Sequence, residues 1–255
     1  MPIIPQRITP REKLILAGLY LSKYDLLGLR KLGFETFKEA FNVIGYALGT
    51  RPATIKNYRD EFDPLYSNRR KGWHKRPIRD YCVRVSEKYD NLDSDSFAEL
   101  IKSFVGYDEN IWSELHTKED AGNGNTRFAN RLITGLAAEQ YFESVQPIIS
   151  EFRDYVVENT TRLGCGYDFR LRTEPTCQDF IAVEVKGLRG PSGSVSITAK
   201  EHGTAAVLRD RFFPFIVKNF QDRPFHQIFQ DPLSGTLHLT KTEIVTVQVA
   251  WLAKV

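Results

Sequence analysis

The sequence is poor in cysteine and has no long apolar run. Its three cysteines, Cys82, Cys165 and Cys177, stand singly, without the paired spacing that a zinc site or a disulfide framework needs. No segment reaches the roughly 20 apolar residues of a membrane-spanning helix, and the first residues lack the basic, apolar and small-residue order of a secretion signal. We therefore expect reduced thiols, no membrane contact and a cytoplasmic location.

An excess of charge of one sign is also missing. The 35 Lys and Arg residues nearly balance the 32 Asp and Glu residues, and the net charge is +3. The chain is 42% hydrophobic and 26% charged, which is typical of a globular protein. The charges are unevenly distributed, because residues 51–84 contain ten basic residues against four acidic ones. That segment is the best candidate for a surface that binds nucleic acid.

Helical periodicity dominates the first part of the chain. Apolar residues recur at helical spacing from about residue 7 to residue 105, which predicts an all-α domain over residues 1–115. Within it, residues 37–48 and 53–62 predict two helices joined by a tight turn. Gly49 can adopt the left-handed conformation that ends a helix, and Pro52 suits the first turn of the next one. This layout is typical of a helix-turn-helix that reads DNA.

The second helix of this pair and the basic loop after it supply the predicted DNA contacts. Ile55 and Tyr58 are expected to face inward, so that polar neighbours can reach a groove of double-stranded DNA. Asn57 suits an adenine edge, and Arg59 suits a guanine edge or a phosphate. The loop over residues 68–77 is basic and aromatic, as phosphate or minor-groove contacts require. The predicted contacts are Arg51, Thr54, Lys56, Asn57, Arg59, Arg69, Arg70, Lys71, Trp73, His74, Lys75, Arg76 and, in the later loop 187–194, Arg189.

Strand patterns belong to the second half of the chain. A polar, glycine-rich run over residues 120–126 predicts a domain boundary, and we assign residues 116–255 to a second domain. A helix is expected over residues 128–156, with an interruption at Pro147. Strands are expected over residues 167–172, 180–186, 195–198, 212–217 and 243–251. The predicted fold class is α+β, with an all-α helix-turn-helix-like domain followed by an α/β domain.

Three charged residues in this half carry the candidate chemistry. Residues two apart in a strand point to the same face, so Glu184 and Lys186 are expected to project together from an otherwise apolar strand. Buried charges are costly unless they pair or bind a metal. Asp168, Glu184 and the carbonyl of Val185 are suitable ligands for Mg²⁺, with Mn²⁺ as a substitute. Lys186 can orient the attacking water and stabilise negative charge during phosphodiester hydrolysis.

These residues resemble the PD-(D/E)XK nuclease superfamily, which implies a mixed sheet flanked by helices and metal-dependent cleavage of DNA. Gly-Tyr stands here where the family's short motif has Pro before the aspartate. The order of elements is similar to a domain found at the C-terminus of restriction and defence proteins. That resemblance implies that Glu139 is an accessory catalytic acid and that Glu201 lies at the edge of the site. The elements read Gly135 with Glu139, Gly166-Tyr167-Asp168, Glu184-Val185-Lys186-Gly187 and Thr198 with Glu201.

The leading functional prediction is a Mg²⁺-dependent, site-specific type II restriction enzyme that cuts double-stranded DNA. We expect a homodimer, because one active site per chain cuts one strand and two-fold symmetry matches a palindromic site. A modification-dependent, nicking or repair nuclease is an alternative. A DNA-binding regulator with an inactive nuclease-like domain is an alternative of another class. Two purely structural explanations also stay open. Glu184 and Lys186 could form an ion pair that only stabilises the fold, and the helical pair could serve only for packing, beside a solvated loop.

Overall fold

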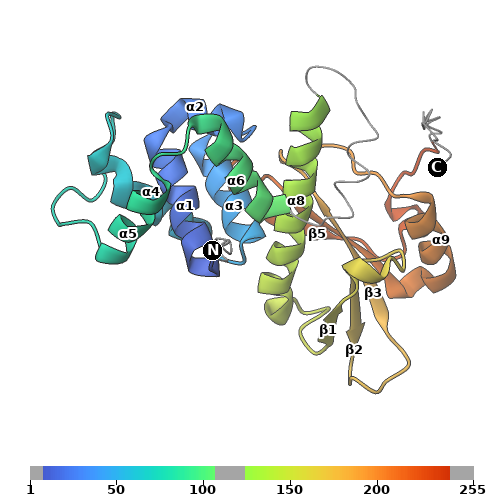
Figure 1. The fold of residues 1–255 in the computed structure, drawn as a ribbon. Coiled ribbons are helices and arrows are strands. Elements are labelled where there is room, and N and C mark those ends of the chain that lie inside the picture. Colours follow the sequence, from blue (N-terminus) through green and yellow to red (C-terminus); the bar gives the residue numbers. More distant parts are fainter. Residues whose placement is uncertain (1–7, 107–123, 242–255) are drawn as a thin grey trace, which may run out of the picture.

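The computed structural model describes residues 8–106 and 124–241 (Figure 1). Helices form the N-terminal part, as the periodicity predicts. Thr9 caps the first helix, and it exchanges hydrogen bonds with Glu12 in a capping box, which satisfies backbone groups that a helix start leaves open. The helices are α1 (Pro10–Lys23), α2 (Asp25–Lys31), α3 (Phe37–Ala47), α4 (Pro52–Phe62), α5 (Asp80–Tyr89) and α6 (Ser94–Gly106).

The predicted helical pair is confirmed within one residue at each end by α3 and α4. Gly49 follows α3 with a φ of +66°, and Pro52 occupies the first turn of α4. A Cβ on Gly45 would lie 2.9 Å from the Cα of Pro52, so only glycine permits this close approach of the two helices. Ile55 is fully buried, as expected.

A mixed five-stranded sheet occupies the C-terminal part of the described chain. Its order is β1-β2-β3-β4-β5. Neighbouring strands pair antiparallel except for β3 and β4, which are parallel and are connected through helix α9 (Ala199–Leu208). The strands are β1 (Val156–Asn159), β2 (Phe169–Arg172), β3 (Ile181–Gly187), β4 (Phe212–Lys218) and β5 (Phe225–Ile228).

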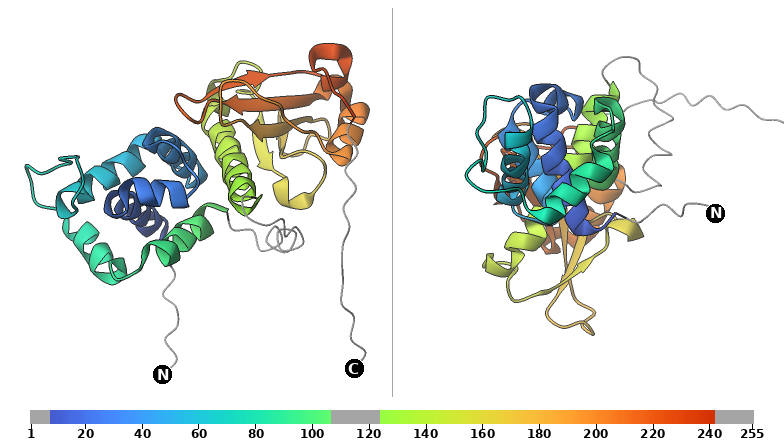
Figure 2. Two further views of the ribbon diagram at one scale, coloured as in Figure 1. Left: turned by 90° about the horizontal axis from the view of Figure 1, so that it is seen from above. Right: turned by 60° about the vertical axis from the view of Figure 1, so that its left-hand side comes forward.

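Helix α8 (Gly124–Val145) lies between the N-terminal helices and the sheet (Figures 1 and 2). Its Phe142 ring lies 4.8 Å from the ring of Phe169 in β2 and 5.0 Å from that of Phe215 in β4, measured between centroids. One continuous cluster of buried apolar residues extends from α1 through α8 into the sheet. The helices and the sheet therefore share a hydrophobic core, which stabilises their relative placement.

The second face of the sheet is covered by α9. Ala205 and Leu208 of this helix form a smaller buried cluster with Ala182 of β3 and Phe212 of β4. The neighbouring Val183 belongs instead to the main core on the α8 side. The alternation predicted for this strand is thus confirmed, and it places Glu184 and Lys186 on the same side as Ala182.

Other predictions for this half need correction. The strand expected over residues 195–198 is wrong, because Thr198 caps α9 in a capping box with Glu201. Strands β1 and β5 and helix α9 were not predicted from the sequence. The strand expected over residues 243–251 and the boundary between residues 115 and 116 lie outside the described residues. In the ranges that the structure describes, no helix is long and apolar enough to cross a bilayer.

Candidate active site

Asp168 lies immediately before β2, opposite the second half of β3. Its backbone N–H donates to the carbonyl of Val183 at 3.1 Å, and its Oδ2 accepts from the N–H of Val185 at 2.8 Å. The Asp168 carboxylate therefore accepts the hydrogen bond that a backbone carbonyl would accept if the pairing of β2 and β3 continued. In an antiparallel pair, the N–H and C=O of one residue point toward the same neighbour. The carbonyl of Val185 thus points toward the side of β3 on which Asp168 lies.

Glu184 and Lys186 form a buried ion pair on β3. The Glu184 residue is 3% exposed, and the Lys186 Nζ donates to its Oε1 at 2.5 Å. The same Nζ donates to Oε2 of Glu201 at 3.0 Å. Because Glu201 belongs to the first turn of α9 and also caps it through Thr198, this helix fixes the second partner of the lysine.

Glu139 approaches the site from α8. The hydroxyl of Thr161 donates to its Oε2 at 3.5 Å. Burial and then the negative charge of Asp168 raise the pKa of Glu139 to about 8, and the positive charge of Lys186 opposes this. The residue before Thr161, Thr160, donates its backbone N–H to the carbonyl of Asp168 at 2.8 Å, so the contact with Thr161 places Glu139 near the β2–β3 site.

The pKa values of Asp168 and Glu184 are also raised above those of ordinary carboxyl groups. Burial raises the pKa of Asp168. Burial also raises the pKa of Glu184, and the negative charge of Asp168 raises it further. For Lys186, burial opposes the charged form, but Glu184 and Glu201 outweigh it and raise the pKa. Hydrogen bonds thus bring Asp168, Glu184, Lys186 and Glu201 together around β3, and Glu139 approaches this cluster from α8.

The carboxylates of the cluster raise the question of whether they could hold a metal ion. Within the described part of the chain, no group of three or more His, Cys, Asp or Glu side chains could hold a metal ion. Mg²⁺ does not require three such ligands, because it retains several waters and is held by one or two carboxylates plus substrate phosphates. Asp168 and Glu184 are buried acids, and the negative charge of Asp168 destabilises the charged form of Glu184; a divalent cation would offset that repulsion. These two carboxylates and the Val185 carbonyl fit such a partial site.

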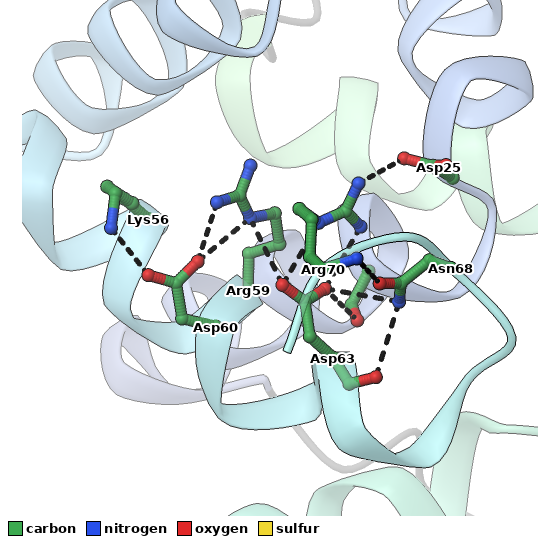
Figure 3. A network of polar contacts seen from close by, with 8 residues as sticks. Asp25, Lys56, Arg59, Asp60, Asp63, Asn68 and Arg70 are labelled. Carbon is green, nitrogen blue, oxygen red and sulfur yellow. Dashed lines mark hydrogen bonds and ion pairs between the residues drawn. The ribbon is translucent and has the colours of Figure 1, made fainter. Parts of the chain in front are cut away.

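The predicted DNA contacts on and after α4 fall into two groups. Thr54, Arg70 and Trp73 are half-buried, whereas most of the others are exposed. Arg59 departs from the prediction, because it is only 8% exposed. Its guanidinium donates to Asp60 (Figure 3) and lies over the ring of Phe41 at 4.8 Å. The exposed predicted contacts are Arg51, Lys56, Asn57, Arg69, Lys71, His74, Lys75 and Arg76.

Buried acids at the end of α4 hold the basic loop in place (Figure 3). Arg70 donates to both oxygens of Asp63, at 3.0 and 2.9 Å, and it also pairs with Asp25. Gly72 has a φ of +50°, and a Cβ there would lie 2.2 Å from the carbonyl oxygen of Asp60. This network was not predictable from local patterns, because its partners are up to 45 residues apart. These contacts attach the basic loop to the end of α4.

Glu61 anchors the other end of the loop. Its side chain is 1% exposed and accepts hydrogen bonds from Arg76 and from the backbone and guanidinium of Arg79. Burial raises the pKa of Glu61, but these hydrogen bonds overcome that effect and hold it at about 2. We expect Glu61→Gln to lower the free energy of unfolding by about 2 kcal/mol at pH 7, because two arginines lose their carboxylate.

The pH dependence of this loss follows from the lowered pKa. The carboxylate stabilises the fold above about pH 4.5, its ordinary pKa, and that contribution disappears as the pH falls toward 2. Urea denaturation of wild type and Glu61→Gln between pH 7 and pH 2 measures the effect. The two stabilities should converge at low pH; a difference that stays constant over the whole range would contradict the assignment.

Arg189 does not occupy the free position that the sequence suggested. It was predicted as a DNA contact in a flexible loop after β3. In the structure, its guanidinium binds both oxygens of Glu39 on α3 and one oxygen of Glu35. The side chain remains 42% exposed, but its donors are engaged by the helical part of the chain.

One comparison with known proteins gives a match. Residues 138–230 match the family model described as "Protein NO VEIN, C-terminal". The match covers less than half of the chain, and it contains every acidic and basic residue of the cluster around β3. No curated protein and no solved structure matches the chain.

Proposed function

We propose that the chain is a Mg²⁺-dependent DNA endonuclease of the PD-(D/E)XK type. The observation that carries this proposal is the cluster of Glu139, Asp168, Glu184 and Lys186 around β2 and β3. Asp168, immediately before β2, accepts a hydrogen bond from the backbone of β3, and Glu184 and Lys186 on β3 are hydrogen-bonded to each other. Such fixed groups suit a reaction in which negative charge develops on a phosphate.

Each residue has a distinct chemical part in the proposed reaction. When bound, Mg²⁺ supplies Lewis acidity and lowers the pKa of water. Asp168, Glu184 and the Val185 carbonyl would hold it. Lys186 would donate to the attacking water or to a phosphate oxygen, and the carboxylates of Glu184 and Glu201 keep its ammonium charged and oriented. Glu139, with a pKa of about 8, holds a proton near neutral pH and can hydrogen-bond water at the edge of the site.

The proposed substrate is double-stranded DNA. The α3–α4 pair consists of two helices joined by a short turn at Gly49, the layout expected of a helix-turn-helix, and Arg51, Lys56 and Asn57 at α4 are exposed. These side chains can contact phosphates and base edges. We infer a site-specific enzyme of the type II restriction class that acts as a homodimer, with modification-dependent, nicking and repair nucleases as variants of the same chemistry.

One observation favours a second candidate, a DNA-binding regulator without nuclease activity. Lys186 already pairs with both Glu184 and Glu201, and such a triad can serve as a structural element of the sheet and α9. In that case α4 and the basic loop would bind DNA, and the cluster would stabilise the fold alone.

A panel of DNA substrates separates these candidates. Purified protein is incubated with Mg²⁺ and unmodified phage DNA, the same DNA carrying modified cytosines or adenines, and a nicked or mismatched duplex. Discrete fragments from unmodified DNA support the restriction enzyme, and cutting of only one other substrate class supports the corresponding variant. Tight binding with no cleavage of any substrate would contradict the nuclease and support the regulator.

A further inference from the structure

A charged pair joins the loop after β3 to the first helix of the α3–α4 pair. Arg189 Nε and Nη2 donate to the two oxygens of Glu39 at 2.5 and 2.9 Å, and Nη1 donates to Glu35 at 2.9 Å. The side chain of Glu39 is 4% exposed. A bidentate arginine–carboxylate pair fixes both distance and orientation, and the burial of Glu39 reduces the screening of the pair by salt.

A second polar contact joins the same two parts of the chain. The side-chain amide of Asn42, also on α3, donates to the carbonyls of Phe220 and Asp222 at 2.8 and 2.9 Å. These acceptors lie in the loop after β4. That loop is bonded to the loop after β3, because the N–H of Gln221 donates to the carbonyl of Arg189 at 3.0 Å. Helix α3 therefore contacts the ends of both central strands through one connected unit.

The two residues between Arg189 and the proposed catalytic Lys186 are tightly packed. A Cβ on Gly187 would lie 2.7 Å from the carbonyl oxygen of Thr134 in α8, so this residue is packed directly against the helix. The N–H of Leu188 donates to the carbonyl of Val217 in β4 at 2.7 Å. On the other side of the pair, α3 packs closely on α4 at Gly45. The chain thus forms a continuous path of tight contacts from α4 to Lys186.

We propose that the Arg189–Glu39 pair is a positioning device that sets the distance between the DNA-reading helix and the catalytic cluster. This inference rests on the proposed nuclease function. Arg189 contacts no reacting atom in this account; it is a positioning residue that acts through α3. A fixed distance between reading and cutting elements makes the enzyme cut at a constant offset from its recognition site, and misplacement by about 1 Å can slow the reaction by about 100-fold.

The test uses Arg189→Gln in the full chain on an end-labelled duplex. We expect DNA affinity to stay within about twofold of wild type, while kcat falls by about tenfold or more and the cuts spread to neighbouring positions. Reversal of the pair, Glu39→Arg with Arg189→Glu, should restore a single cut position. The matched control is Lys38→Gln: Lys38 and Asp222 form an ion pair across the same interface, but both side chains are more than half exposed, so its loss should change neither rate nor position.

Hydrogen exchange supplies a readout that does not depend on activity. In Arg189→Gln, the amides of Leu188, Asn219 and Gln221 should exchange faster than in wild type, and in Lys38→Gln they should not. Unchanged cut positions together with unchanged exchange would overturn the inference and leave the proposed function intact. A wild-type protein that cuts no DNA would end both the proposed function and the positioning role, while exchange would still report whether Arg189 holds α3 against the sheet.

Discussion

Replacement of Lys186 by methionine is expected to lower the rate of DNA cleavage on the order of 10³-fold, with DNA affinity unchanged within about twofold. Methionine preserves most of the side-chain volume but removes the ammonium that lies between Glu184 and Glu201. The reaction then lacks the positive charge that stabilises the developing negative charge on the phosphate. Rates are measured under single-turnover conditions, and affinity is measured with Ca²⁺ in place of Mg²⁺.

The control for this variant is Lys200→Met on the first turn of α9. Lys200 is exposed and is adjacent to Glu201, but it belongs to no ion pair of the cluster. Its rate should stay within about twofold of wild type, as surface substitutions generally do. Equal losses in both variants would show a general electrostatic effect of α9, and an unchanged rate in Lys186→Met would remove this residue from the mechanism.

Stability of the metal-free protein is expected to decrease as the pH rises from about 4.5 to 8. Burial and the charge of Asp168 raise the pKa of Glu139 from 4.5 to about 8, so the folded protein keeps a proton that the unfolded chain releases. The free energy of unfolding therefore falls with pH over this window, by on the order of 2 kcal/mol after allowance for partial solvent access of Glu139. Urea denaturation in EDTA measures it, and Glu139→Gln should make the slope shallower, while the raised pKa values of Asp168 and Glu184 keep part of it.

Mg²⁺ is expected to restore this lost stability. A ligand that binds only the folded state stabilises it by about 2.7 kcal/mol at a hundredfold excess over its Kd. Asp168→Asn should abolish the effect of Mg²⁺, whereas Glu99→Gln, an exposed carboxylate on α6, should retain it. A stability in EDTA that is flat or rises between pH 4.5 and pH 8 would contradict the raised pKa of Glu139, and equal Mg²⁺ stabilisation of wild type and Asp168→Asn would contradict the proposed ligand.

Local sequence patterns were sufficient for α3, α4 and β3, but the prediction missed α9, which carries Glu201. The bounds of α3 and α4 and the face shared by Glu184 and Lys186 follow from periodicity and from Gly49 and Pro52, because these signals act within one or two turns. The pairing of Asp168 with the N–H of Val185 was not predictable, because it depends on the register of two strands. Thr198 followed by Glu201 is a capping-box pattern that indicates a helix start, and the prediction of a strand over residues 195–198 overlooked it.

The misplaced residues share one physical cause. Arg59 and Arg189 are arginines in basic or flexible stretches, where exposure and contact with DNA are a reasonable expectation. Arg59 is buried against Asp60 and the aromatic rings of α3, and Arg189 binds Glu39, which lies 150 residues away in the chain. Composition reveals how many charges a segment has, but only the fold reveals which of them are already neutralised by a buried acid.

Cleavage of an end-labelled duplex by wild type and Glu184→Gln, each with Mg²⁺ and with EDTA, tests the central claim most directly. Glutamine keeps the shape of the buried side chain, and it removes the charge that would bind the metal. We expect cleavage only by the wild type with Mg²⁺, and equal DNA binding by both proteins. Cleavage by Glu184→Gln at the wild-type rate, or cleavage by the wild type that persists in EDTA, would contradict it.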